Sequence, residues 1–172
     1  LTAIYVTHDQ KEALSISDRM AILESGKIAQ IGPPEDVYRR PHSRVVADFI
    51  GETNFLPGKI TSAEGEDIRV ETGIGIFSGV VGDPAWKPLP GETATLSVRP
   101  EAWTIQTNPN GPNTIKGRIG ESIYLGEVAQ YHFQSGTLAL KIFELNPHLS
   151  SRPTDRDLFA TAAPGDVVVL QH

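Results

Sequence analysis

The sequence predicts a mainly β protein with a short α/β segment at its N-terminus. Two observations carry this prediction. Residues 2–13 pass from an apolar, β-branched stretch into a pattern typical of a helix start. From Asn54 onward the chain consists of short alternating stretches divided by Gly, Pro, Asn and Asp, without a long helical pattern. We therefore expect a domain boundary near residues 51–54, dividing the chain into residues 1–52 and 53–172.

Composition narrows the class of protein. The 172 residues suffice for one large or two small domains. A net charge of −6 argues against a nucleic-acid partner, which needs a basic face. The chain contains no cysteine, which excludes disulfides and thiolate metal sites. Because it begins with Leu1 at the start of a strand pattern, we expect it to be a piece of a longer protein.

The first element is an apolar run over residues 4–7, which predicts a short buried strand that stops at His8. Asp9 is placed as a helix N-cap, and Glu12 follows at the spacing of a capping box. His8 would then project from a strand-to-helix turn, where open α/β sheets bind phosphates and substrates. A structural, hydrogen-bonded histidine is the alternative on these residues alone.

The rest of the N-terminal part contains three further elements. Residues 20–31 predict a β-hairpin with glycine in its turn. Residues 33–40 predict a short helix that starts with proline and carries acidic residues in its first turn. Residues 43–51 predict a second helix, with Ser43 as its cap and Gly51 just past its end.

From Asn54 onward, the sequence predicts several separate strands. Residues 68–72, 94–99 and 137–142 alternate apolar and polar side chains, which predicts strands with one buried face. Residues 167–170 form a continuous apolar run, which predicts a buried strand.

This region contains a weak internal sequence repeat, the echo, which suggests two related halves. Residues 54–60 resemble residues 113–119, since each stretch has Asn, three residues, Gly, a base and then Ile. Residues 90–92, Pro-Gly-Glu, likewise match residues 164–166, Pro-Gly-Asp, each before a strand. Two related halves of about 50–60 residues would form two small, similar barrels. A chance match over so few letters is the alternative.

Residues 2–54 resemble the end of the nucleotide-binding domain in the ATPase subunits of ABC-type importers. This resemblance implies that His8 is the switch histidine, which contacts the γ-phosphate of ATP in the parent protein. The stretches that carry it are Tyr5-Val6-Thr7-His8-Asp9-Gln10, Glu12-Ala13, Asp18-Arg19, Gly26-Lys27-Ile28, Gln30-Ile31-Gly32-Pro33-Pro34, Val37-Tyr38, Pro41, Val46-Ala47, Phe49-Ile50-Gly51 and Asn54.

The later region resembles the accessory β domain called TOBE, through Arg99-Pro100-Glu101 and Tyr124-Leu125-Gly126. This resemblance implies tandem OB-like small barrels, of the TOBE/MOP type, that follow the tail of a P-loop ATPase domain. It also implies pairing with an identical ATPase subunit through the β domain, membrane permease subunits as partners, and a place on the cytoplasmic face of the bacterial membrane.

The chain lacks the parts that grip a nucleotide. The phosphate-binding string Gly-x-x-x-x-Gly-Lys-Ser/Thr does not occur, and neither do the ABC signature loop and catalytic glutamate that would precede this segment. We therefore expect ATP and Mg²⁺ as cofactors of the parent protein, and neither a cofactor nor ATPase activity for this chain alone. We also expect no metal site, because His42, His148 and His172 have no ligand spacing.

The leading interpretation is the C-terminal part of an ABC-importer ATP-binding subunit, which couples ATP hydrolysis to solute uptake. Residues 49–54 resemble polyamine-type members most. The alternative is a stand-alone, TOBE-type module that binds a small oxyanion. An OB-type nucleic-acid binder is disfavoured, because the chain is acidic and only 7% of its residues are aromatic. Without the rest of a parallel sheet, we expect residues 1–25 to be rearranged, domain-swapped or poorly ordered.

Overall fold

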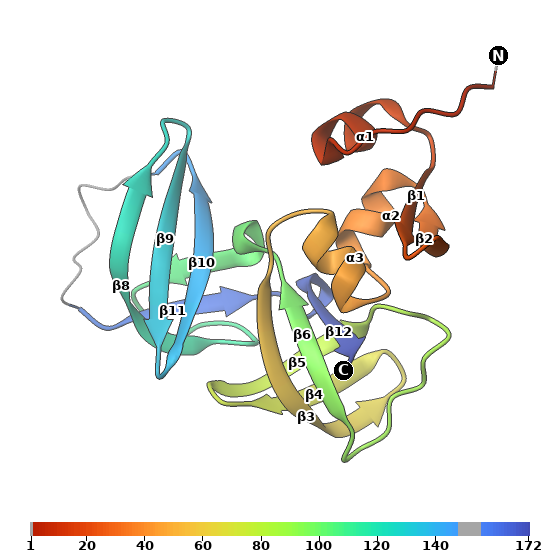
Figure 1. The fold of residues 1–172 in the computed structure, drawn as a ribbon. Coiled ribbons are helices and arrows are strands. Elements are labelled where there is room, and N and C mark those ends of the chain that lie inside the picture. Colours follow the sequence, from red (N-terminus) through yellow and green to blue (C-terminus); the bar gives the residue numbers. More distant parts are fainter. Residues whose placement is uncertain (1, 148–155) are drawn as a thin grey trace.

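The computed structural model describes residues 2–147 and 156–172. It has three parts: an N-terminal segment (residues 2–53), a closed five-stranded barrel that we call the first unit, and an open five-stranded sheet that we call the second unit (Figure 1). The two units together are the β domain. The prediction of a mainly β protein with a short α/β segment at the N-terminus is confirmed. None of the helices in the described ranges has the length and apolar character that membrane crossing requires.

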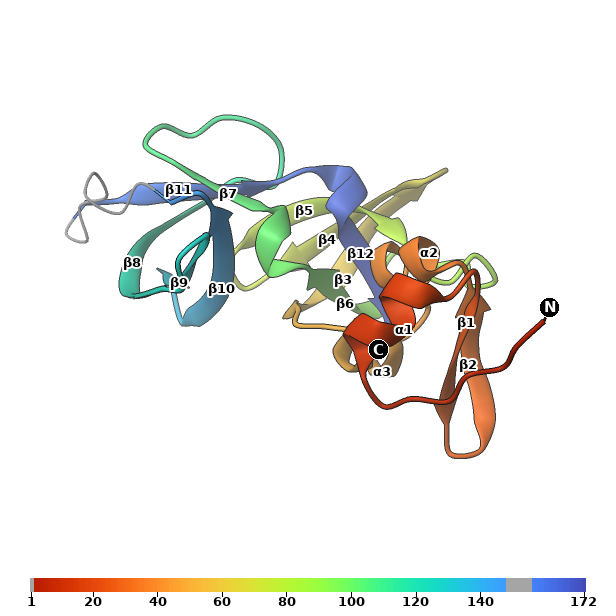
Figure 2. The same cartoon turned by 90° about the horizontal axis from the view of Figure 1, so that it is seen from above.

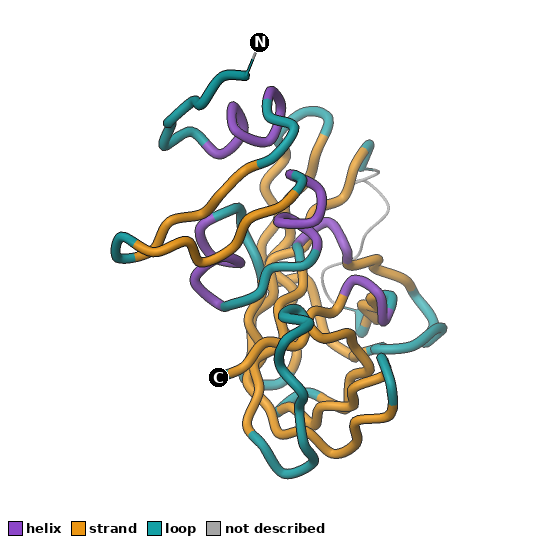
Figure 3. The backbone as a smooth tube through the Cα atoms, turned by 90° about the vertical axis from the view of Figure 1, so that its right-hand side faces the viewer, coloured by secondary structure: helices purple, strands orange, loops and turns teal. Residues whose placement is uncertain are grey.

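The N-terminal segment holds the helices and the hairpin that the sequence predicts (Figure 3). Its turn at Ser25 and Gly26 has positive φ at both residues, 49° and 77°, which matches the twist of a tight hairpin. A small separate core forms around Met20, Val37 and Ile50. The elements are α1 (Gln10–Ile16), β1 (Met20–Glu24), β2 (Lys27–Gly32), α2 (Pro34–Arg39) and α3 (Arg44–Phe49).

Residues 2–7 do not form the strand that the sequence predicts. Ile4 is 94% exposed and Val6 is 90% exposed, so their apolar side chains have no core to enter. A strand is held by hydrogen bonds to a neighbour, and within the described residues no strand pairs with this stretch. Directly after it, α1 and β1 form as the sequence predicts.

The first unit is closed by a strand from far along the chain. Its order is β12-β5-β4-β3-β6, and β12 pairs with both β6 and β5. The pairing is antiparallel to β6 and parallel to β5. The strands are β3 (Asn54–Glu64), β4 (Asp67–Thr72), β5 (Gly75–Val81), β6 (Thr93–Val98) and β12 (Val167–Gln171).

The second unit is a curved sheet in the order β10-β9-β8-β11-β7. It differs from the expected second barrel because its edge strands, β10 and β7, do not pair with each other. The 3-10 turn η1 lies against β10 instead. The elements are η1 (Pro100–Ala102), β7 (Trp103–Gln106), β8 (Ile115–Tyr124), β9 (Val128–Ser135), β10 (Leu138–Leu145), β11 (Leu158–Ala162) and η3 (Pro164–Asp166).

The two units exchange strands, so they are not consecutive halves of the chain. After β6, the chain crosses through η1 and adds β7 to the second unit; after β11, it crosses back through η3 and adds β12 to the first (Figure 2). Residues 164–166 therefore correspond to residues 100–102, each a 3-10 turn on a crossover. The predicted match of residues 164–166 with residues 90–92 is wrong.

The echo between residues 54–60 and 113–119 is a structural repeat. A Cβ added at Gly58 would collide with the backbone of Glu71, and one at Gly117 would collide with that of Gln134. Each glycine lets its strand cross closely over its neighbour. The strand register shifts just after residue 60 in one copy and just after residue 119 in the other, so both copies also carry a β-bulge.

One hydrophobic core joins the two units. Its largest fully buried side chains include Phe77 of the first unit and Tyr131 and Phe133 of the second. Trp103 of β7 meets Phe77 of β5 edge to face, with ring centroids 6.2 Å apart. Trp103 is thus a packing residue.

Candidate functional site

The turn around His8 is built by hydrogen bonds of its neighbours. The Glu12 backbone N–H donates to Asp9 Oδ1 at 3.0 Å, which confirms Asp9 as the N-cap of α1. The Glu12 carboxylate does not complete a capping box. It accepts hydrogen bonds from the hydroxyls of Tyr5 at 3.0 Å and Thr7 at 2.7 Å. This contact with Glu12 raises the pKa of Tyr5.

His8 itself lies exposed on this turn. Neither of the two cavities described below includes it. The phosphate-binding string is also missing from the sequence. The placement of His8 at the start of α1 agrees with the expected turn, although the strand before it is absent.

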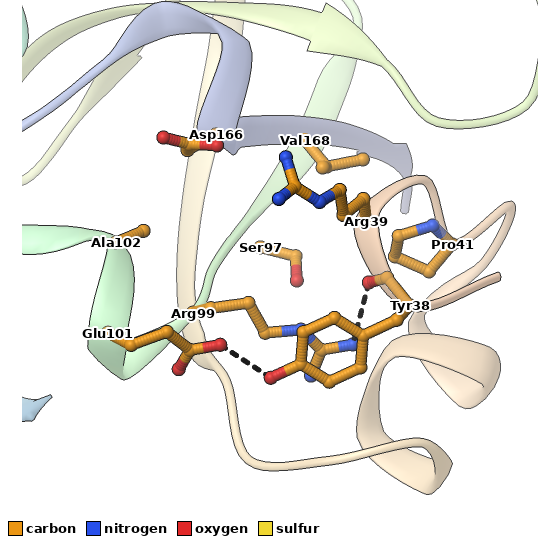
Figure 4. Close-up of a pocket in the computed structure, with 9 residues that line it drawn as sticks. All are labelled: Tyr38, Arg39, Pro41, Ser97, Arg99, Glu101, Ala102, Asp166 and Val168. Carbon is orange, nitrogen blue, oxygen red and sulfur yellow. Dashed lines mark hydrogen bonds between the residues drawn. The ribbon is translucent and has the colours of Figure 1, made fainter. Parts of the chain in front are cut away.

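The most organised polar site joins the N-terminal segment to the first unit (Figure 4). Its centre is Arg99, which follows β6 and is only 8% exposed. The Arg99 guanidinium lies over the ring of Tyr38, 4.4 Å from its centroid. The Tyr38 hydroxyl donates to the Glu101 carboxylate at 2.5 Å. The end of α2 therefore meets the stretch from Arg99 to η1, which lies far along the sequence.

Burial controls the protonation of this group. Burial and the hydrogen bond to Glu101 raise the pKa of Tyr38 to about 12. Burial also lowers the pKa of Arg99, yet a guanidinium stays charged at neutral pH. The site thus holds a neutral phenol that is hydrogen-bonded to the Glu101 carboxylate, together with a buried cation. These contacts connect the N-terminal segment to the first unit and to η1.

A cavity of about 290 Å³ lies beside Arg99. Figure 4 shows Arg39 and Asp166 across this cavity from Tyr38 and Glu101, with Ser97 between them. Both crossovers border it, since Glu101 belongs to η1 and Asp166 to η3. A second cavity of about 360 Å³ lies between β2, α2 and the chain after β5.

The histidines expected to bind no metal have ordinary partners where they are described. The backbone N–H of His42 donates to Gln30, and the His172 ring contacts Thr95. His148 lies outside the described residues. Within residues 2–147 and 156–172, no three or more acidic or histidine side chains gather as metal ligands.

The role of Arg99 is a feature that the sequence did not reveal. Arg99-Pro100-Glu101 resembles a feature of TOBE domains, but an arginine at the end of an alternating strand normally predicts an exposed charge. The available signal was the proline after it, which ends the strand and starts a crossover.

The β domain resembles known proteins in sequence and in structure. A family model for the TOBE domain matches residues 96–171. In structure, the chain is similar to the cytoplasmic molybdate-binding protein ModG in its molybdate-bound form, with a TM-score of 0.62 and 12% identity. This likeness covers 69% of the chain and 96% of ModG, and it shows the fold alone. The β domain is a TOBE domain.

Similar curated proteins are import ATP-binding proteins. The spermidine/putrescine protein PotA of Pseudomonas fluorescens is 43% identical over 79% of the chain, and that of Trichormus variabilis is 37% identical over 100%. The Fe(3+) ion protein FbpC of Brucella abortus is 38% identical over 91%. The chain spans 36%, 46% and 42% of these proteins, less than half of each. The chain is therefore similar to a part of the ATP-binding subunits of ABC importers, and this part includes the TOBE domain.

Proposed function

We propose that this chain is part of an ATP-binding subunit that couples ATP hydrolysis to solute uptake. The observation that supports it is similarity to import ATP-binding proteins along the whole chain, including the 37% identity to the Trichormus variabilis protein. In this proposal, residues 1–52 are the end of the ATPase domain and residues 53–172 are the β domain. The parent protein would use ATP and Mg²⁺.

His8 is the proposed switch histidine, the residue that contacts the γ-phosphate in the parent. Replacing His8 by Ala in the complete transporter is expected to lower ATP turnover by about two orders of magnitude, since one preorganised donor contributes about 3–4 kcal/mol. Nucleotide binding should remain. Lys11→Ala, an exposed change on α1, is the matched control. Wild-type turnover in His8→Ala would refute the role.

The chain alone should not hydrolyse ATP, because it carries no phosphate-gripping lysine loop. A phosphate-release assay on the purified chain, beside the complete subunit, tests this expectation. Turnover by the chain alone would overturn it.

The β domain is proposed to serve regulation and to pair with an identical subunit. The parent would sit on the cytoplasmic face of the membrane by binding permease subunits, and nucleic acid is not a proposed partner. Sedimentation of the complete subunit with and without residues 54–172 tests the pairing. Equal dimer formation by both forms would place the interface elsewhere.

The proposed solute is a polyamine, supported by residues 49–54 and by the relatives named for spermidine and putrescine. A relative named for Fe(3+) ions is nearly as similar. Uptake of labelled spermidine and of ferric iron by cells with the complete transporter distinguishes the two solutes.

The alternative function is an oxyanion-binding module. Calorimetric titration of the chain with molybdate, sulfate and phosphate tests it directly. Saturable binding of one of these ions would favour that alternative over a purely regulatory domain.

A further inference from the structure

Arg99 directly follows β6 of the first unit, and its side chain makes hydrogen bonds with the N-terminal segment. Its Nη1 donates to the carbonyl oxygens of Ala47 at 2.9 Å, Gly51 at 2.8 Å and Glu52 at 3.0 Å. Its Nη2 donates to the carbonyl of Tyr38 at 3.2 Å. One side chain that follows β6 thus binds backbone carbonyls of α2 and α3 and of Gly51 and Glu52, just past α3.

These acceptors lie at the ends of α2 and α3. The last carbonyls of a helix have no partner within it, and a nearby cation stabilises them. An arginine suits this task because its planar fork presents several donors in fixed directions. A lysine ammonium is compact and would reach fewer of the four carbonyls. The geometry therefore requires a guanidinium rather than a positive charge alone.

The charge of Arg99 is stabilised by these dipoles, by the Tyr38 ring and by the nearby charge of Glu101. None of the ion pairs among the described residues involves Arg99. Glu101, the carboxylate nearest in sequence, accepts the hydroxyl of Tyr38. Moving α2 and α3 away would leave a buried cation without its acceptors, which is costly. The contact thus favours one arrangement of the two parts.

A second arginine fixes the other crossover. Arg40, at the end of α2, donates through Nη1 to the Gly165 carbonyl in η3 at 2.7 Å. Arg99 directly precedes η1, so each crossover is tied to the N-terminal segment by one arginine. The cavity of about 290 Å³ lies between these ties. Tyr38 and Arg39 of α2 line this cavity.

Other contacts also cross this boundary. Ala47 packs with Val168 and Leu170, and Arg44 lies over the Phe55 ring at 4.7 Å. The contact of Ala47 is apolar and not directional, so it holds the parts together without fixing one angle between them. The Arg44 side chain is exposed, and a cation–π contact at an exposed site is weak.

We propose that Arg99 is a positioning residue that sets the orientation of the N-terminal segment on the β domain. Under the proposed function, this contact would carry movement of an ATPase domain to the TOBE domain. The orientation is a property of this chain, so its test does not depend on the transporter.

The absence of cysteine allows clean labelling. Spin labels on cysteines at Asp48 and Glu71, both exposed, report the N-terminal segment against the first unit. Labels at Glu71 and Ser122 report the first unit against the second. Double electron–electron resonance gives the distance distribution of each pair.

In R99A, the distribution for positions 48 and 71 should broaden, whereas that for positions 71 and 122 should keep its wild-type width. Amides of α2 and α3 should exchange with solvent about tenfold faster or more, because hydrogen bonds to a charged group are lost. R99K should also broaden the first distribution, although it keeps the charge. R118A, which removes an exposed arginine paired with Asp157, is the matched control and should match wild type.

Unchanged 48–71 distributions in both R99A and R99K would overturn the proposal. Broadening of both label pairs in R99A would also overturn it, because Arg99 would then be a general stability residue. If R99A does not fold, R99K carries the test. If the complete transporter had no ATPase activity, the proposed function would be contradicted. The distance measurements on Arg99 variants would still test the positioning role of Arg99.

Discussion

Asn54 and Asn113 make matching pairs of hydrogen bonds across the boundary between the two units. Asn54 Oδ1 accepts the Lys141 N–H at 2.8 Å and its Nδ2 donates to the Lys141 carbonyl at 2.8 Å. Asn113 Oδ1 accepts the Ser78 N–H at 2.7 Å and its Nδ2 donates to the Ser78 carbonyl at 2.9 Å. Each asparagine thus connects its own unit to a strand of the other, Asn54 to β10 and Asn113 to β5.

These ties predict a specific cost for removing either amide. Asn54→Ala and Asn113→Ala should each lower the free energy of unfolding by about 1–3 kcal/mol, because buried backbone groups lose their partners. Urea denaturation measures this loss. Asn108→Ala, at an exposed loop position, is the control and should be neutral. A neutral Asn54→Ala would mean that water replaces the amide.

The repeated glycines predict a second effect. Gly58→Ala and Gly117→Ala should each cost about 1–3 kcal/mol, since the added methyl meets backbone and forces a strand to shift. Thermal unfolding measures the change. Gly73→Ala is the matched control, because a Cβ at Gly73 meets nothing within 4 Å and its φ is not positive. Equal Tm values for Gly58→Ala and Gly73→Ala would contradict the close crossing.

Tyr38 predicts a pH dependence at high pH. Its pKa rises from 10.0 in the unfolded reference to about 12 in the fold. The folded state therefore keeps a proton that the unfolded state loses, and this contribution to stability disappears as pH rises from about 10 to about 12. Denaturation at a series of pH values should show this decrease. Tyr38→Phe should flatten it, and an unchanged slope would assign the titration to other groups.

Replacing His8 should have little effect on the stability of this chain. Because His8 is exposed, His8→Ala should change the free energy of unfolding by less than about 0.5 kcal/mol. Urea denaturation of the chain tests this value. Asp9→Ala is the contrasting variant and should cost about 1 kcal/mol, because it removes the N-cap of α1. A larger loss in His8→Ala would restore the structural interpretation of this histidine.

Local chemistry was predictable from the sequence. The Asp9 cap, the hairpin turn at Gly26 and the cap at Ser43 all depend on residues within a few positions of one another, and all form as predicted. The echo that starts at Asn54 and Asn113 was also visible, because each copy needs the same asparagine and glycine for the same contacts.

Distant pairing was not predictable in this way. The apolar run at residues 167–170 predicts a buried strand, but its sequence does not indicate that this strand closes a barrel that begins at Asn54. The strand expected at residues 4–7 depends on neighbours that the described residues do not supply. The role of Arg99 depends on backbone carbonyls about 50 residues away. Because every residue has such a carbonyl, the sequence does not show which ones accept a hydrogen bond from Arg99.

The exchange of strands at η1 and η3 also governs when the molecule can fold. The barrel that opens with β3 is completed only by β12, more than a hundred residues later, so its closure carries the entropy of a very long loop. Such high contact order slows folding. A ribosome-bound chain would hold β3 to β6 as an unclosed sheet until β12 emerged, and in that interval the exposed strand edges would depend on chaperones for protection.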